Sequence, residues 1–200
     1  GFALHGAAPA TLYVTATVAS LPVGLHVRHL SVTADSATVL ATRFVTPRLP
    51  GEETAAPQTT VGGVKYGGEV LVIAAGAFTQ TGTIILEHGE QPDTSNSAKG
   101  IPNYLGAAAI SPDGQTAWVP SKQDNIKRGT LRNNGDLTHD MTIRSIASRI
   151  LLGTQTEELA GRVDFDNAGI ASPAAFDPNG IFVFTALEGS REVAVVDAWA

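Results

Sequence analysis

The chain has 200 residues, a formal net charge of -6 and no cysteine. Without cysteine it cannot form disulfides or thiolate metal sites, use a cysteine nucleophile, or attach haem c covalently. Its 13 lysines and arginines are scattered, which argues against a nucleic-acid surface, and no apolar run approaches the ~18 residues of a membrane span.

The first elements in the chain are short strands. Residues 11–18 (TLYVTATV) predict a strand within an N-terminal stretch that ends at residue 28. Residues 30–40 (LSVTADSATVL) predict two strands around a polar turn at Asp35. β-Branched residues dominate 69–75 and favour a third strand there, and residues 81–87 predict a fourth, outer strand.

A second unit follows, and its turn is better defined. Residues 110–119 (ISPDGQTAWV) predict a strand, a tight turn and an apolar strand. Proline presets φ for the turn, aspartate caps its own backbone, and Gly114 accepts a positive φ. Residues 141–152 and 159–165 predict the third and fourth strands of this unit, and a helix over 146–160 is the alternative.

A third unit repeats the pattern at the C-terminal end of the sequence. Residues 176–184 (FDPNGIFVF) carry the matching turn, and residues 192–198 (EVAVVDA) predict the next strand. Three intervening segments, 47–68, 90–103 and 121–140, are rich in turn-forming or polar residues and are predicted as long loops.

Four antiparallel strands per unit are typical of a β-propeller blade, so the fold class is all-β. The predicted organisation is the end of a preceding blade at 1–28, blades at 29–104 and 105–169, and a partial blade at 170–200. Closed propellers have about four to eight blades. We therefore expect an incomplete ring, completed by the remainder of a parent chain or by another chain.

The turn and strand motifs resemble the YVTN-type propeller repeats of bacterial surface and periplasmic proteins. Residues 111–114 (SPDG) match the turn of that repeat, and residues 192–197 (EVAVVD) match its Val-Asp strand. The resemblance covers most of residues 29–200, and the first unit departs from it at Asp35, where proline and glycine are missing.

Longer stretches are similar to propellers of proteins that also carry a cytochrome c peroxidase-like di-haem domain. These stretches are residues 105–125 (LGAAAISPDGQTAWVPSKQDN), Arg128-Gly129 and residues 190–193 (SREV). The resemblance implies an extracytoplasmic protein of electron transfer, located in the periplasm or at the cell surface. Haem c and a haem-domain partner would then belong elsewhere in the parent protein, because this chain has no Cys-x-x-Cys-His motif.

Charged and polar residues just beyond the predicted second strands are candidates for partner binding. Such residues are expected at one end of the ring, where propellers often bind. The candidates are Arg43, Lys122, Asp124, Asn125, Arg128 and Arg191. A solvated loop is the alternative for the run from Lys122 to Arg128.

An acidic cluster at residues 163–167 (VDFDN) is the candidate metal site. Asp164, Asp166 and Asn167 offer oxygen ligands of the kind that calcium prefers, although the full calcium-loop pattern is absent. His26 and His29 are three residues apart, and in a strand this spacing puts their side chains on opposite faces. Structural or solvated roles are the alternative for all of these residues.

The sequence contains no serine-nucleophile elbow, phosphate-binding loop or His-Glu-x-x-His zinc motif. Gly106 and Gly114 are interpreted as hairpin glycines, because no βαβ unit surrounds them. With no complete catalytic set, the first hypothesis is a scaffold and interaction module of an extracytoplasmic redox or surface protein. The alternatives are a lactonase-like, metal-dependent propeller hydrolase and a cell-surface adhesion module.

Overall fold

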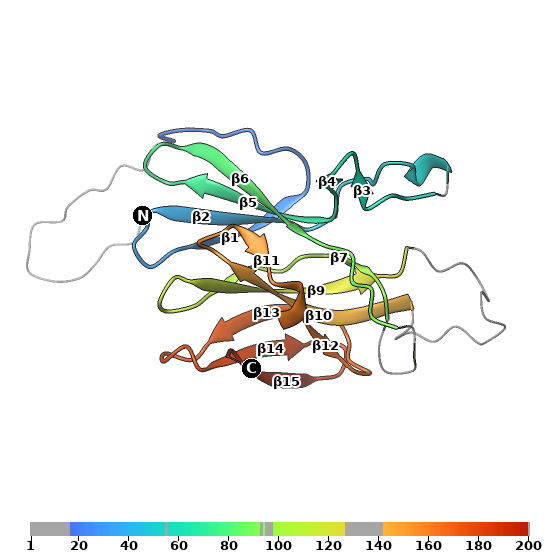
Figure 1. Ribbon diagram of the computed structural model, residues 1–200. Coiled ribbons are helices and arrows are strands. Elements are labelled where there is room, and N and C mark those ends of the chain that lie inside the picture. The colour runs from blue at the N-terminus through green and yellow to red at the C-terminus, as the bar shows by residue number, and fades with distance from the viewer. Residues whose placement is uncertain (1–16, 55, 93, 95–97, 127–141, 200) are drawn as a thin grey trace, which may run out of the picture.

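The computed structural model describes residues 17–54, 56–92, 94, 98–126 and 142–199. In this part of the chain the regular structure is antiparallel β-sheet plus two short 3-10 turns, η1 (Glu52–Thr54) and η2 (Leu159–Gly161). The three main sheets lie one above another in chain order (Figure 1). None of the described helices is long and apolar enough to cross a membrane.

The first sheet has four strands in the order β1 (Val27–Val32), β2 (Thr38–Arg43), β5 (Gly68–Ala74) and β6 (Thr79–Leu86). All neighbours are antiparallel, and these strands overlap those predicted around the Asp35 turn, at 69–75 and at 81–87. The segment between β2 and β5, predicted as a loop, contains η1 and a small hairpin of β3 (Thr60–Val61) and β4 (Val64–Lys65). This hairpin projects beside the first sheet (Figure 1).

The second sheet is built around β9 (Thr116–Asp124) and β10 (Ile143–Leu151), which pair along their full lengths. On its inner side, β7 (Ile101–Asn103) and β8 (Ala109–Ile110) both pair with β9. On its outer side, β11 (Thr156–Glu157) and β12 (Val163–Phe165) both pair with β10. A helix over 146–160 does not form, because β10 occupies its first half.

Two predicted loops are corrected by this sheet. The sequence predicts a loop over residues 121–140, but β9 continues to Asp124. The segment 90–103 ends in β7, which pairs with the same part of β9. Buried polar residues, Ser121 and Gln123, alternate along β9 and hide the apolar periodicity by which strands are recognised.

The third sheet has three strands in the order β13 (Ala171–Phe176), β14 (Phe182–Leu187) and β15 (Glu192–Asp197). Two apolar layers hold the three sheets together. The layer between the first and second sheets includes Leu40, Val70, Val72, Ile84, Leu86, Leu105, Val119 and Ile150. The layer between the second and third sheets includes Trp118, Ala147, Phe165, Ala171, Val183 and Leu187.

The same aspartate-capped turn connects the first two strands of the units. Asp113 Oδ1 accepts hydrogen bonds from Ser111 Oγ at 2.5 Å and from the Gln115 backbone N–H at 3.0 Å. Gly114 follows with a φ of 71°. The first unit forms the equivalent turn without glycine, because Ser36 takes a φ of 59° and Asp35 accepts from Thr33 and Ala37.

These sheets are blades of an incomplete β-propeller, which confirms the predicted fold class. The inner strands of neighbouring blades, β1, β8 and β13, approach one another. The blades have two ends. We call the end that carries the Asp35, Asp113 and Asp177 turns the turn end, and the opposite end, where β2, β9 and β14 finish, the loop end.

Candidate functional site at the loop end

The loop end holds all of the described candidate binding residues. Arg43 is the last residue of β2. Lys122 and Asp124 lie among the last three residues of β9, and Asn125 follows this strand directly. Arg191 lies in the connection between β14 and β15 with a φ of 60°. Arg128 lies outside the described residues. The binding role of this group stays a prediction.

Arg43 is engaged in holding its own blade together. Its Nε lies 2.5 Å from Glu69 Oε2 on the neighbouring strand, and its Nη1 donates to the Leu25 carbonyl at 2.6 Å. The side chain is only 17% exposed. Arg43 therefore fastens the segment before β1 to β2 and β5, and it presents little of its charge to a partner.

Lys122 and Asp124 form an ion pair within β9, whereas the sequence predicts that both follow the strand. Lys122 Nζ is 2.6 Å from Asp124 Oδ1, and Asn103 Nδ2 donates to Asp124 Oδ2 at 2.8 Å. Lys122 Nζ also lies 4.2 Å from the centre of the Tyr104 ring. The pair therefore connects β9 with the inner strand of its own blade.

Two aromatic rings from neighbouring blades stack beside this pair. The rings of Phe44 and Tyr104 have centroids 4.6 Å apart and are inclined by 14°. Arg28 also lies over the Phe44 ring, with its guanidinium carbon 4.3 Å from the centroid. The result is a cluster of four side chains in contact, Arg28, Phe44, Tyr104 and Lys122, which we call the loop-end stack. Cation–π contacts of this kind contribute about 0.5–1 kcal/mol at exposed sites.

The backbone around Tyr104 is held in an uncommon conformation. Tyr104 has a φ of 54°, in the left-handed region that costs a bulky residue of order 1–3 kcal/mol. Asn103 Oδ1 offsets part of this cost by accepting the backbone N–H groups of Tyr104 and Thr46, both at 3.0 Å. Because Thr46 belongs to the first blade, Asn103 fixes the stack across the blade boundary.

Sequence reasoning missed most of this arrangement. Arg28, Asn103 and Tyr104 were not among the candidates, and no local signal could have identified them. Phe44 and Tyr104 are distant in the chain and meet only when the first two blades pack. The structure does not join Arg43 to the Lys122–Asp124 pair, since the two acidic partners belong to different blades.

The candidate calcium ligands face an arginine. Arg144 Nη2 lies 3.4 Å from Asp166 Oδ1, and Arg144 Nε lies 4.0 Å from Asp164 Oδ2. Asn167 has a φ of 49° in the turn after β12. Within the described ranges no group of three or more histidine, aspartate or glutamate side chains is arranged to hold a metal ion. The acidic cluster is thus neutralised by a guanidinium in this structure.

Burial raises the pKa of Asp164 above its usual value, and the positive charges of Arg144 and Arg162 only partly oppose this shift. Asp164 is the one described candidate whose carboxyl group is perturbed in this direction. Buried groups with raised pKa values are common at ligand sites as well as in structural networks.

Of the two neighbouring histidines His26 and His29, only His29 lies on a strand. His26 lies in the turn before β1 with a φ of 64°, and His29 lies within β1. Burial, followed by the nearby charge of Arg28, lowers the pKa of His29. His29 therefore stays neutral to lower pH than an ordinary histidine.

Comparison with known proteins places the fold. No protein-family model matches the chain, and no curated protein matches it either. Among solved structures, hydrazine synthase from Kuenenia stuttgartiensis is similar with a TM-score of 0.54 at 13% identity, over 86% of this chain and 40% of that one. A putative 6-phosphogluconolactonase from Bacteroides fragilis has a TM-score of 0.48 at 13% identity, over 86% of this chain and 34% of that one. The chain thus spans well under half of these proteins, and at such identities the likeness is one of fold.

Proposed function

We propose that this chain is a scaffold and interaction module of a larger extracytoplasmic redox or surface protein, and that it binds partners through its loop end. In this proposal the blades run over residues 29–104, 105–169 and 170–200, except that β7 and the adjoining Tyr104 belong to the second blade because β7 pairs with β9, and residues 1–28 end a preceding blade. The remainder of the parent chain, or another chain, completes the ring.

The loop-end stack is the observation that carries the proposal. Tyr104 is 38% exposed and Arg28 is exposed, while Asn103 fixes the backbone of both contributing loops. Aromatic and arginine side chains on a fixed backbone are typical of the energetically important residues of protein interfaces. The exposed cation of this group, Arg28, favours a partner surface that carries carboxylates, whereas Lys122 is mostly buried and paired with Asp124.

The redox part of the proposal rests on the resemblance of residues 105–125 and 190–193 to propellers joined to di-haem domains. The reading frame of the parent gene tests it directly. We expect Cys-x-x-Cys-His motifs in the same frame, and a complete frame without any would contradict the redox version and leave the surface version.

A binding measurement tests the role of the loop end. Calorimetric titration of the chain with the haem domain from the same frame is expected to give a complex. Arg28→Glu and Tyr104→Ala should each weaken it by about tenfold, because the first places a carboxylate against an acidic partner and the second removes an exposed aromatic contact. Gln115→Glu, at the exposed turn end, is the matched control. Equal affinities for all four proteins would exclude the loop end as the contact surface.

A further inference from the structure

A polar cavity lies between the first and second blades, next to the acidic cluster but separate from the loop-end stack. Its volume is about 290 Å³. The chain leaving β6 forms one wall, and β9, η2 and β12 form the other. The lining residues are Gly89, Glu90, Gln91, Gln123, Leu159, Ala160, Arg162 and Asp164. This volume is just below the range of about 300–1,000 Å³ that is usual for small-molecule sites.

The donor side of the cavity comes from Arg162, whose side chain is only 5% exposed. Its Nη2 donates to Glu157 Oε1 at 2.7 Å and to the Glu87 carbonyl at 2.5 Å, which places it across the blade boundary. Its Nη1 is buried and has no hydrogen-bond partner among the described residues. Leaving a buried charged donor without an acceptor is costly, so this atom favours a ligand oxygen.

Asp164 supplies the hydrogen-bond acceptors of the cavity, and its carboxylate makes only long contacts with its neighbours. Gln123 Nε2 lies 3.4 Å from Asp164 Oδ1, and Arg144 Nε lies 4.0 Å from Asp164 Oδ2. Both distances exceed those of strong charge-assisted hydrogen bonds, about 2.7–2.9 Å. The side chain is 22% exposed and therefore retains access to the cavity. Its oxygens favour a hydroxyl or N–H donor.

The charge around the cavity selects among ligand classes. Asp164 and Glu90 would repel a phosphate or a carboxylate, whereas Arg162 and Arg144 would repel a cation. Leu159, which is 40% exposed, and Ala160 add an apolar surface from η2. An uncharged molecule that has vicinal hydroxyls on a C–H framework satisfies all of these groups, because each hydroxyl both donates and accepts.

We propose that this inter-blade cavity binds a neutral polyhydroxylated ligand of monosaccharide size, held by hydroxyl hydrogen bonds to Asp164 and Arg162. Gln123 extends the polar wall, and its Nε2 is fixed by the Ala98 carbonyl at 2.8 Å. Because Gly89 to Gln91 belong to the exit of the first blade and the other lining residues to the second, a bound ligand links the two blades.

Ligand-observed NMR with D-glucose, D-mannose and N-acetyl-D-glucosamine at millimolar concentration tests the proposal. We expect saturation transfer to at least one sugar. In a separate protein-observed spectrum, we expect the Leu159 methyl resonances to shift when that sugar is added. Asp164→Ala should weaken this binding by about tenfold or more, the effect of losing one well-placed charged hydrogen bond. Asp166→Ala is the matched control, because Asp166 shares the Arg144 partner but does not line the cavity.

A second variant keeps the test decisive if Asp164→Ala disturbs folding. Leu159→Arg changes an exposed side chain and places a long group across the cavity, so it should abolish binding while the circular dichroism spectrum stays unchanged. Failure of all three sugars to bind, or binding unaffected by both variants, would overturn the proposal. Saturable binding of calcium or inorganic phosphate that depends on Asp164 would also overturn it, in favour of a charged ligand.

Discussion

At the scale of single residues, the aspartates of the turn end act through hydrogen bonds that form within a few positions of the chain. Asp35, Asp113 and Asp177 each accept backbone N–H groups two to five residues ahead. Side-chain hydrogen bonds from Thr33 and Ser111, and backbone ones at Phe182, hold the pKa values of these three carboxyl groups below their ordinary values. The same type of local hydrogen bond thus stabilises one turn in each of the three blades.

These shifts predict how stability depends on pH. A carboxyl group with a lowered pKa in the folded state contributes stability above its unfolded pKa of about 3.9 and loses it as pH falls further. Asp113→Asn keeps an oxygen acceptor for the turn but removes the titrating charge. We expect its urea-unfolding free energy to change less than that of the wild type between pH 5 and pH 3, as measured by circular dichroism.

Asp113→Ala is the comparison variant, because it removes the acceptor as well and should lower stability at every pH. An unchanged acid transition in Asp113→Asn would show that the Ser111 and Gln115 hydrogen bonds do not depend on the charge.

At the scale of elements, the inner strands meet at a glycine. Gly106 lies between β7 and β8, and its N–H donates to the Pro120 carbonyl at 2.8 Å. Thr42 Oγ1 of the first blade donates to the Gly106 carbonyl at 2.9 Å. A Cβ at this position would lie 2.3 Å from the carbonyl oxygen of Ser172 in the third blade. Gly106 is therefore a close-approach glycine and not the hairpin glycine predicted, whereas Gly114 is one.

Gly106→Ala tests this contact between three blades. The added methyl group meets backbone, which cannot move away as a flexible side chain could, so we expect a loss of about 1–3 kcal/mol in unfolding free energy. Gly76→Ala is the matched control, since no atom lies within 4 Å of the corresponding Cβ. A destabilisation by Gly106→Ala no larger than that of the control would contradict the close approach of the blades.

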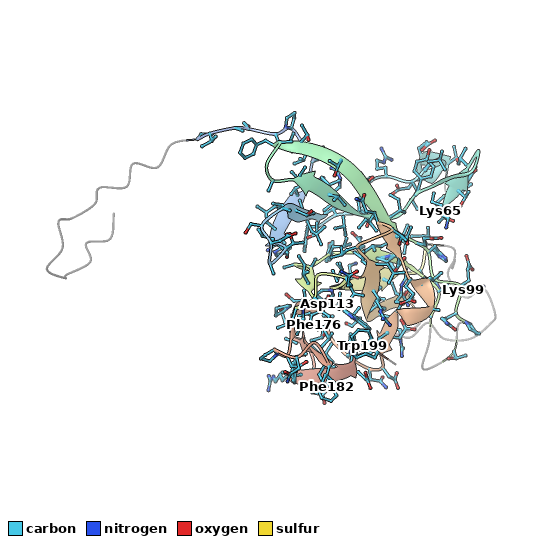
Figure 2. The ribbon with its side chains drawn as sticks, turned by 60° about the vertical axis from the view of Figure 1, so that its left-hand side comes forward. Lys65, Lys99, Asp113, Phe176, Phe182 and Trp199 are labelled. Carbon is cyan, nitrogen blue, oxygen red and sulfur yellow. The ribbon has the colours of Figure 1, made fainter. Side chains whose placement is uncertain are left out.

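At the scale of the whole molecule, the third sheet has an apolar outer face. Phe182, Phe184, Val193 and Val195 are between 38% and 62% exposed, and the register pairs Phe184 with Val195. Figure 2 shows Phe182 on the side of the molecule away from the first sheet. The equivalent face of the first sheet is covered by the second sheet, and that of the second sheet is covered by the third. We expect a further blade to cover this outer face in the complete ring.

An uncovered face of this kind predicts self-association of the isolated chain. We expect the 200-residue chain to elute from size-exclusion chromatography as an oligomer or to precipitate. Val193→Thr combined with Val195→Thr should shift it toward the monomer, because both changes keep β-branched side chains while making the face polar. Val64→Thr, an equally exposed change on the β4 hairpin, should not. A sharp monomeric peak for the unchanged chain would contradict the incomplete ring.

Much of the fold is determined by the sequence itself, because its signals are local. The turns around Asp35, Asp113 and Asp177 need only neighbouring residues, and the β-branched residues of β5 and β15 favour strands without reference to the rest of the chain. The prediction failed at the end of β9, where the buried polar side chains of Ser121 and Gln123 break the apolar periodicity that marks a strand, and at β7, whose three residues are too few to show a periodicity.

Only the tertiary structure decided which side chains meet. Phe44 reaches Tyr104, Arg162 reaches Glu87, and Gly106 approaches Ser172 because separate blades pack face to face. Such contacts depend on the packing of sheets, and no spacing along the chain encodes them. The sequence by itself therefore determined the repeated blade and its turns, while blade packing created the loop-end stack and the inter-blade cavity.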